Sequence, residues 1–330
     1  MGGRGRHVEV SQPVDLLVLG WGKGGKTLAA HAAREGRKVA LVERSADMVG
    51  GACINVACIP TKILVHESLQ RSRDEQRGLD DDAEAAFEAA VTRRDTLTSA
   101  MRHKNFDLLD GLDSVLLVQG QATFTGEREV LVTGGEETLR LTAETVVINT
   151  GSRAAVPSIE GATIGGRIHD STTVQHVEPR PARLVVVGGG YVGLELAGVF
   201  ARFGTDVVVL DRGDRPLARE DEDVAEAVVD ALAQDGVRIV SRADVTSLEE
   251  SADAVHVTAE VAGEVATYDA EAVLLAVGRV PVTDGLGLEV AGIATDGAGW
   301  VVVDERLRTS APGVLAVGDV NGGPQFTYVS

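Results

Sequence analysis

The sequence predicts an α/β fold with two Rossmann-like three-layer nucleotide-binding domains. Two segments share one plan: an apolar strand, a glycine-rich turn, a helix and a second apolar strand that ends in an acidic residue. The first segment begins near Val14 and the second near Leu184. Continuous apolar runs such as Val39 to Val42 are typical of parallel sheets that are buried on both faces. With 330 residues the chain also exceeds the usual size of one domain.

Both glycine turns fit the G-x-G-x-x-G pattern of dinucleotide-binding sites. The pattern glycines are Gly20, Gly22 and Gly25 in the first copy and Gly188, Gly190 and Gly193 in the second. These positions allow a tight turn, a close approach of the backbone to a pyrophosphate, and close packing of helix on strand. Each copy ends in an acid, Glu43 or Asp211, where a carboxylate can accept hydrogen bonds from a ribose. Two copies with matched acids indicate two dinucleotide sites.

The first turn also fits a second pattern. Gly20, Gly25, Lys26 and Thr27 match G-x-x-x-x-G-K-[ST], the phosphate loop of nucleoside triphosphatases. A nucleoside triphosphatase is therefore an alternative from another functional class. The second copy lacks the Lys-Thr pair but repeats the rest of the plan, and Glu43 suits a ribose better than a triphosphate. On the preferred interpretation, Lys26 and Thr27 are ordinary residues of the first helical turn.

The charge balance excludes some partners. The chain has 31 Lys and Arg against 50 Asp and Glu, a formal net charge of −19. This charge opposes nucleic acid or an anionic membrane as a partner. No apolar run is long enough to span a membrane. The segment Met1 to Pro13 lacks the apolar stretch of a signal peptide, so a cytoplasmic location is expected.

The two cysteines of the chain, Cys53 and Cys58, lie five positions apart. In a reducing compartment such a pair is more often redox-active or metal-binding than a structural disulfide. One pair supplies half of a four-ligand zinc site, and no histidine cluster stands nearby, so no metal site is predicted. On a regular helix the two Cα atoms would be about 8–9 Å apart, beyond the range of about 4.4–6.8 Å that a disulfide tolerates. The pair can bond only where the backbone is distorted; otherwise the two are buried small hydrophobic residues.

The segment Gly50 to Lys62 resembles the cysteine motif of the class I pyridine nucleotide-disulfide oxidoreductases, as do the two glycine motifs and the run Thr309 to Asp319. That family includes glutathione reductase, dihydrolipoamide dehydrogenase and mercuric reductase. The resemblance implies FAD and NAD(P)H as cofactors and an NAD(P)H domain inserted in the FAD domain. It implies that residues 1–152 and 281–330 form the FAD-binding domain and residues 153–280 the NAD(P)H-binding domain.

The resemblance also implies a role for individual residues. Cys58 matches the thiol beside the flavin, and Cys53 matches the interchange thiol that attacks the substrate. Lys62 and Glu195 match an ion pair near the flavin, and Tyr191 matches the residue that covers the nicotinamide pocket. The implied cofactor-binding residues are Gly20, Gly22, Gly25, Glu43, Arg44, Gly51, Ala52, Lys62, Ala122, Gly151, Gly188, Gly190, Gly193, Asp211, Gly278 and Asp319.

The second dinucleotide is expected to be NADH. A carboxylate at the position of Asp211 accepts hydrogen bonds from a free ribose 2′-OH and repels a 2′-phosphate. Arg212 and Arg215 stand close enough in the sequence to weaken that preference, which leaves NADPH as the alternative.

Five short runs resemble one branch of the family, the reactive-chlorine-resistance flavoproteins. They are Gly24 to Leu28, Ile59 to Lys62, Leu64 to His66, Lys104 to Phe106, and Gln325 to Ser330. That branch is associated with small oxidants, including hypothiocyanite, and with copper(II), which are therefore the expected substrates. Dihydrolipoamide, a glutathione-type disulfide and mercuric ion are the alternatives.

The chain departs from the family pattern in two respects. Ala52 and Ala57 stand where the family usually has Thr and Gly. Family members also continue into a dimerisation domain with a His-Glu acid/base pair, whereas this sequence stops at Ser330, and neither His66 nor His103 can be assigned that role. A homodimer is therefore expected of the full-length family, and a non-catalytic flavin-binding fragment is a further alternative.

Overall fold

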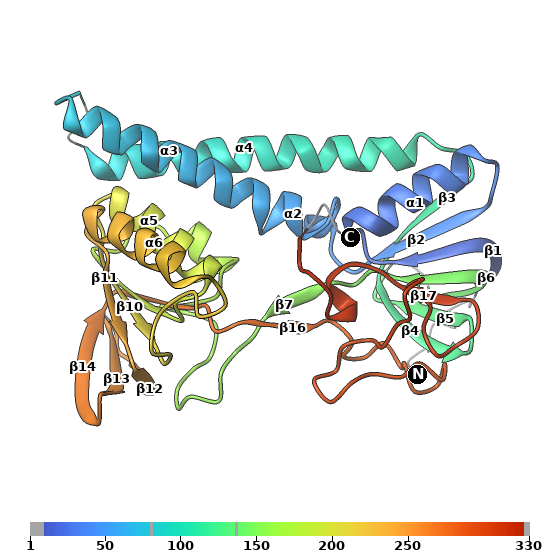
Figure 1. The fold of residues 1–330 in the computed structure, drawn as a ribbon. Coiled ribbons are helices and arrows are strands. Elements are labelled where there is room, and N and C mark those ends of the chain that lie inside the picture. The colour runs from blue at the N-terminus through green and yellow to red at the C-terminus, as the bar shows by residue number, and fades with distance from the viewer. Residues whose placement is uncertain (1–9, 80–81, 136–137, 327–330) are drawn as a thin grey trace, which may run out of the picture. The chain divides into compact units, whose positions relative to one another are not determined.

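The computed structural model describes residues 10–79, 82–135 and 138–326 of the chain (Figure 1). Most of the polar N-terminal segment and the last four residues of the run Gln325 to Ser330 lie outside the described residues. The chain divides into two units: the first comprises Met1–Asn55, Thr98–Arg153 and Val280–Ser330, and the second comprises Val56–Leu97 and Ala154–Arg279. Residues 56–97, which the sequence expectation assigned to the FAD domain, thus group with the second unit.

The first unit is built on a seven-stranded sheet. Its strands, in spatial order, are β3 (Val115–Gln119), β2 (Val39–Glu43), β1 (Val10–Leu19), β6 (Leu139–Ile148), β5 (Glu129–Thr133) and β4 (Gln121–Gly126), and β17 (Val314–Ala316) pairs with β6. The β3-β2-β1-β6 part is parallel, and β6-β5-β4 is antiparallel. Leu17 in β1 pairs with Ala40 on one side and Val146 on the other. The strand that leads into the first glycine turn therefore lies in the middle of the sheet.

Both faces of this sheet are covered, which explains the continuous apolar runs. Leu17 and Leu19 of β1 belong to a core formed with β4, β5 and the segment around 286–320. Leu16 and Val18, which point to the other face, pack with alanines of helix α1 (Lys23–Arg34) and with Leu109. Apolar residues on both faces are what a sheet buried on both sides requires.

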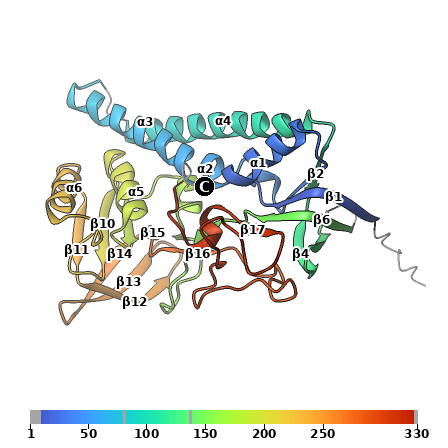
Figure 2. The same ribbon diagram turned by 45° about the vertical axis from the view of Figure 1, so that its right-hand side comes forward.

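The second unit has the same three-layer plan. Its parallel sheet runs β11 (Arg238–Ser241), β10 (Asp206–Asp211), β9 (Arg183–Val187), β15 (Ala272–Leu275) and β8 (Ile168–His169). One face carries the helices α5 (Tyr191–Arg202) and α6 (Glu222–Gln234), and the other carries the antiparallel strands β12 (Ala243–Glu250), β13 (Val255–Val261) and β14 (Glu264–Ala270) (Figure 2). Leu184 and Val186 of β9 pack toward the helices, whereas Val185 and Val187 pack toward the antiparallel strands.

Two long helices complete the core of the second unit. Helix α3 (Cys58–Gln76) packs on α5, and α4 (Ala83–Asp110) contributes its first half to this unit. Phe87 of α4 contacts Phe200 and Phe203, with ring centroids 5.7 and 5.3 Å apart. This aromatic cluster is fully buried.

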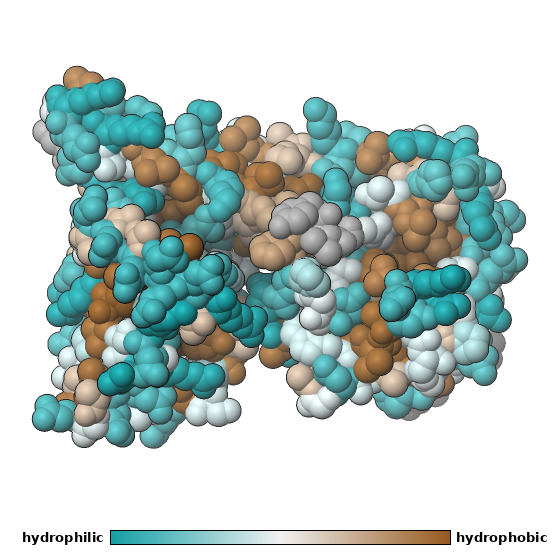
Figure 3. All heavy atoms as spheres, in the orientation of Figure 1, coloured by the Kyte–Doolittle hydropathy of each residue, from teal (hydrophilic) through white to brown (hydrophobic). Residues whose placement is uncertain are grey.

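Several short helices and strands lie between the elements described above. They are η1 (Ala46–Met48), α2 (Ala52–Asn55), η2 (Thr173–His176), η3 (Gly318–Asn321), and the paired strands β7 (Ser152–Ala154) and β16 (Arg279–Pro281). Among the described residues, no helix has the length and apolar character needed to cross a membrane. The face shown in Figure 3 carries a mixture of hydrophilic and hydrophobic residues. The predicted α/β fold with two Rossmann-like units is confirmed.

Candidate active site

The first glycine turn is shaped around Asn149, which follows strand β6. Gly20 has a φ of +98°, and a Cβ there would lie 2.4 Å from the carbonyl oxygen of Asn149. A Cβ at Gly22 or Gly25 would lie 2.5 or 2.6 Å from the Asn149 side-chain oxygen. All three pattern glycines are therefore required by close packing as well as by the turn.

Asn149 itself was not foreseen from the sequence. Its Oδ1 accepts a hydrogen bond from the Gly25 N–H at 3.0 Å, and its Nδ2 donates to the Val317 carbonyl at 2.9 Å. The side chain is buried and joins the glycine turn, β6 and the end of β17. The available signal was a single polar residue at the end of the apolar run Val146 to Ile148, because a buried polar group needs partners of its own.

Glu43, at the end of β2, lies against the same turn. Its Oε2 accepts a hydrogen bond from the Trp21 N–H at 3.0 Å, and its Oε1 accepts one from the Ser45 N–H at 3.2 Å. Gly22 is the N-cap of α1 and has no side chain with which to cap that helix. The open helix end and the neighbouring carboxylate fit the pyrophosphate and ribose of a dinucleotide.

Lys26 does not fit the phosphate-loop alternative. Its side chain is buried, at 8% exposure, and its Nζ donates to the Gly50 carbonyl at 3.0 Å and to Asn105 Oδ1 at 2.6 Å. A phosphate-loop lysine must instead reach the phosphates of its nucleotide. The expectation that Lys26 is an ordinary first-turn residue is also wrong, because its ammonium is held inside the first unit. Thr27 is exposed, as expected of such a residue.

The segment that carries Cys53 lies directly on the first glycine turn. Gly51 has a φ of +83°, and a Cβ there would lie 2.8 Å from the Cα of Gly22. Only glycine allows so close an approach at this position. Cys53 follows in α2 and is half-buried.

The two cysteines do not share one regular helix. Helix α2 ends at Asn55 and α3 begins at Cys58, which is exposed. Ala57 between them has φ −123° and ψ −102°, outside the helical region. The backbone thus departs from a regular helix between the cysteines, which is the distortion that a disulfide between them would require.

The second glycine turn packs in a similar way but is more open. Gly188 has a φ of +112°, and a Cβ there would lie 2.5 Å from the Ala276 carbonyl oxygen. A Cβ at Gly193 would lie 2.2 Å from the Gly188 carbonyl oxygen, which allows α5 to approach β9 closely. A Cβ at Gly190, the N-cap of α5, would meet nothing within 4 Å. The backbone at Gly190 therefore has open space in front of it.

Asp211 reaches back over this turn. Its Oδ1 accepts a hydrogen bond from the Gly213 N–H at 2.9 Å, and its Oδ2 is 2.2 Å from where a Cβ of Gly189 would be. Arg215, in the loop that follows, donates to the carbonyls of Leu217 at 3.2 Å and Glu220 at 2.7 Å. The Arg215 guanidinium is thus engaged in holding its own loop.

Two further predicted residues, Lys62 and Glu195, are in contact in the second unit. They form an ion pair between α3 and α5, with side chains 65% and 31% exposed. Tyr191, the first residue of α5, is exposed and its hydroxyl hydrogen-bonds to Glu220. That hydrogen bond raises the pKa of Tyr191.

The remaining predicted positions differ in exposure. Asp319 accepts a hydrogen bond from Ser152 Oγ at 2.7 Å, next to Gly151, which has a φ of +72°. Ala122 is buried in the core of the first unit, Ala52 is half-buried at the start of α2, and Gly278 and Arg44 are exposed.

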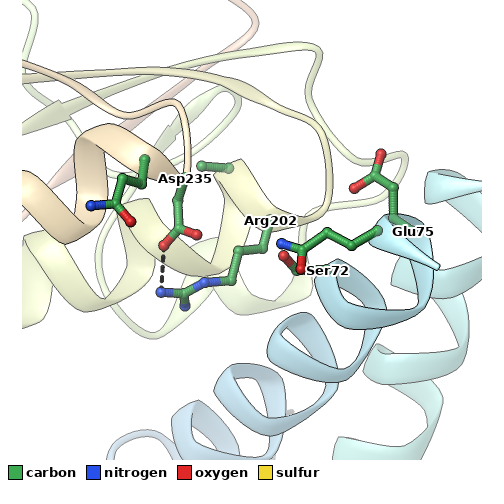
Figure 4. Close-up of a pocket in the computed structure, with 7 residues that line it drawn as sticks. Ser72, Glu75, Arg202 and Asp235 are labelled. Atoms are coloured by element: carbon green, nitrogen blue, oxygen red, sulfur yellow. Dashed lines mark hydrogen bonds and ion pairs between the residues drawn. The ribbon is translucent and has the colours of Figure 1, made fainter.

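A separate pocket of the second unit has a different character. Figure 4 shows it at the end of α3, where Arg202 forms an ion pair with Asp235 at 2.6 Å near Ser72 and Glu75. The pocket is lined mostly by polar side chains, and no glycine turn contributes to it. We assign it no ligand.

The family model described as pyridine nucleotide-disulphide oxidoreductase matches residues 14–330. The chain belongs to this family. Members of the family are enzymes that use FAD and NAD(P)H, so the predicted family, enzyme class and cofactors are confirmed.

Several curated relatives cover nearly all of the chain. The probable pyridine nucleotide-disulfide oxidoreductase RclA of Escherichia coli is 38% identical over 314 residues, which are 95% of this chain and 67% of that protein. Dihydrolipoyl dehydrogenase of Geobacillus stearothermophilus is 36% identical over 324 residues, with coverages of 95% and 67%. A mercuric reductase of Staphylococcus aureus is 33% identical over 323 residues, with coverages of 96% and 57%. The chain therefore spans between about half and two thirds of the length of these relatives.

Solved structures agree with this assignment. The HOCl-induced flavoprotein disulfide reductase RclA from Escherichia coli matches with a TM-score of 0.86 and 38% identity, over 96% of this chain and 68% of that one. Its Cu(II) complex matches with a TM-score of 0.88, the same identity and the same coverages. The fold and the family are thus supported by structure as well as by sequence.

Proposed function

We propose that this flavoprotein oxidoreductase uses NADH to reduce a Cys53–Cys58 disulfide. The two thiols then pass these two electrons to a small oxidant through the Cys53 thiolate, and the Cys53–Cys58 disulfide forms again. The observation that carries this proposal is the packing of Gly51 on Gly22, which brings the segment with Cys53 against the first dinucleotide turn. A redox-active thiol pair needs a two-electron donor, and a bound FAD would supply that chemistry by accepting hydride equivalents from NADH. Residues 1–152 and 281–330 would then form the FAD-binding domain, and residues 153–280 the NADH-binding domain.

The residues of the first unit have specific tasks in this proposal. The open N-terminus of α1 at Gly22 would bind the FAD pyrophosphate, and Glu43 would accept hydrogen bonds from the adenosine ribose. Asp319, held by Ser152, would bind the region between the ribityl chain and the pyrophosphate. In the second unit, Lys62 would place a cation near the flavin, where it favours an anionic reduced form. Glu195 would orient that cation through the ion pair.

The geometry of the second turn supports NADH over NADPH. Asp211 is the acid at the end of β10, and its carboxylate would repel a 2′-phosphate. Arg215 donates its hydrogen bonds to two backbone carbonyls of its own loop, and the structure shows no ion pair between Arg215 and Asp211 among the described residues. Tyr191, exposed at the start of α5, would cover the nicotinamide pocket until NADH displaces it.

For the oxidant we propose copper(II) or hypothiocyanite. The solved RclA from Escherichia coli includes a copper(II) complex, and that protein is described as induced by HOCl. The alternatives, dihydrolipoamide and mercuric ion, follow from the relatives at 36% and 33% identity. A homodimer, the assembly expected of the full-length family, is proposed as well.

The first experiment is an anaerobic titration of the purified protein with NADH, followed by absorbance. We expect a flavin spectrum that gains a long-wavelength thiolate–flavin band, and we expect Cys58→Ser to abolish that band. Cys53→Ser should keep FAD and lose reduction of the oxidant. Unchanged turnover in Cys53→Ser would refute the thiol role, and a colourless protein that takes up no FAD would identify the chain as an inactive fragment.

A further inference from the structure

We propose that Lys26 is a positioning residue of the thiol site, which holds the segment before Cys53 and keeps a positive charge beside that thiol. The proposal deepens the function above, because it rests on Cys53 acting as a thiolate. The family pattern gives Lys26 no role, and the sequence alone suggested only a phosphate-loop lysine or an ordinary helix residue.

The first step of the argument is the fixed position of the ammonium group. Lys26 Nζ donates to the Gly50 carbonyl at 3.0 Å and to Asn105 Oδ1 at 2.6 Å. Asn105 Nδ2 donates in turn to the Met101 carbonyl at 2.8 Å, so its amide is oriented with the oxygen toward Lys26. A lysine that is 8% exposed and bonded to two different elements has little conformational freedom.

The second step concerns the backbone that leads to Cys53. Asn55 Nδ2 donates to the carbonyls of Val49 at 2.8 Å and Gly51 at 3.0 Å, while Lys26 binds the carbonyl of Gly50 between them. Three successive carbonyls therefore accept side-chain hydrogen bonds. Gly50 has a φ of +94°, a conformation that such bonds help to maintain. The start of α2, which carries Cys53, is therefore held by Lys26 from α1 and by Asn55 from the end of α2.

The third step is electrostatic. Asn105 and the Gly50 carbonyl are neutral, so neither compensates the charge of Lys26. Burial lowers the pKa of Lys26, the neighbouring Lys23 on α1 lowers it further, and the negative charge of the Cys53 thiolate on α2 raises it. The interaction between two charges is reciprocal, so a protonated Lys26 favours the Cys53 thiolate. Arg102 on α4 is a further cation near this segment: it bonds to Asn55 and pairs with Asp47 at 3.3 Å.

This charge has a chemical consequence. The thiolate, and not the thiol, is the nucleophile in thiol–disulfide and thiol–oxidant reactions. A buried cation beside Cys53 raises the fraction of thiolate at neutral pH without entering the reaction itself. Lys26 thus acts through Cys53.

The test uses the fact that the chain has two cysteines. In a Cys58→Ser background Cys53 is the one remaining thiol, and its alkylation by iodoacetamide can be followed as a function of pH. We expect Lys26→Gln to slow alkylation about tenfold at neutral pH and to move the midpoint of the profile to higher pH. Lys26→Arg, which keeps the charge, should restore most of the rate. An unchanged midpoint in Lys26→Gln would overturn the proposal. A lower yield of folded protein without a change in the midpoint would overturn it as well.

Two more variants make the result specific. Lys23→Gln removes an exposed charge from the same helical turn, and we expect a much smaller change than for Lys26→Gln. Asn105→Asp keeps Lys26 and adds a carboxylate at its bonding partner, so it should also move the Cys53 midpoint upward if the ammonium charge matters. This variant decides the question even where Lys26→Gln does not fold. The alkylation assay uses neither NADH nor oxidant, so it tests the role of Lys26 separately from the proposed function. The proposed function is tested by the turnover of Cys53→Ser.

Discussion

Lys62 lies one helical turn after Cys58 on α3 and forms an ion pair with Glu195 on α5. The two side chains are 65% and 31% exposed, and exposed pairs of this kind usually contribute less than about 1 kcal/mol to stability. An ion pair that adds little stability next to a predicted redox cysteine suits a role in the chemistry of the site.

We expect Lys62→Met to leave the melting temperature nearly unchanged and to slow reduction of the flavin by NADH by about 10- to 100-fold, because a cation that favours reduced flavin is lost. Stopped-flow absorbance measures this rate. Arg93→Met is a matched control, since Arg93 forms a similar pair with Glu67 at 3.0 Å, with 61% and 26% exposure, in the same unit. Equal rates in Lys62→Met and the wild type would contradict the assigned role.

The two N-cap glycines make a second prediction. A Cβ at Gly22 would lie 2.5 Å from Asn149 Oδ1, whereas a Cβ at Gly190 would meet nothing within 4 Å. We expect Gly22→Ala to lose about 1–3 kcal/mol of stability through overpacking, and Gly190→Ala to keep the wild-type melting temperature. If Gly190 faces the NADH pyrophosphate, its alanine variant should still raise the KM for NADH. Equal loss of stability in both variants would contradict this packing argument.

A third prediction concerns the choice of dinucleotide. Asp211→Asn removes the charge that opposes a 2′-phosphate, so the ratio of kcat/KM for NADPH to that for NADH should rise about tenfold. Steady-state kinetics with both dinucleotides measure the ratio. Asp214→Asn is the control, because Asp214 is three residues away, exposed, and paired with Arg242 at 2.7 Å. A ratio that rises equally in both variants would mean that net charge, and not the position of Asp211, sets the preference.

The fourth prediction is a dependence of stability on pH. Burial lowers the pKa of His176 below its ordinary value of 6.5, and the adjacent Arg94 lowers it further. Arg94 Nη2, which can only donate, lies 3.0 Å from His176 Nδ1, so this nitrogen accepts and the ring is neutral. The unfolded chain therefore binds a proton near pH 6.5 that the folded chain does not, and stability should fall as the pH drops below that value.

We expect His176→Asn, which keeps an acceptor for Arg94, to reduce this acid-side loss in urea unfolding at a series of pH values. Burial also lowers the pKa of His169, so His169→Asn should reduce the loss further in the double variant. A pH profile identical to that of the wild type in the double variant would show that neither ring contributes.

The sequence was sufficient to predict the architecture, because the buried strands and glycine turns are local patterns. Val39 to Val42 and Val207 to Leu210 lie in the parallel sheets as expected. The contact between Lys62 and Glu195, 133 positions apart, was expected from the family resemblance and not from a local pattern. What the sequence did not reveal depends on contacts between distant segments. Asn149 bonds to Gly25 across 124 positions, and Lys26 bonds to Asn105 across 79.

Lys26 shows why local patterns can mislead. A Gly-Lys-Thr sequence at the start of a helix matches a phosphate loop, but the direction of a long flexible side chain depends on the partners that folding brings near it. Here the partners are Gly50 and Asn105, so the Lys26 ammonium group is buried and hydrogen-bonded within the protein instead of contacting solvent or a phosphate. The pattern was correct about the turn and wrong about the lysine.

The apolar character of β9 on both faces has a consequence for insertions and deletions. Leu184 and Val186 face one core and Val185 and Val187 the other, so a slip of one residue would exchange apolar side chains for apolar side chains. Polarity alone would then not resist a shifted strand. Gly188 opposes such a shift. A strand moved by one residue would place Val187 at the position of Gly188, where a Cβ would lie 2.5 Å from the Ala276 carbonyl oxygen. The glycine of the nucleotide turn therefore also sets the alignment of the strand that precedes it, and a one-residue deletion in β9 should be far less tolerated than one in an exposed loop.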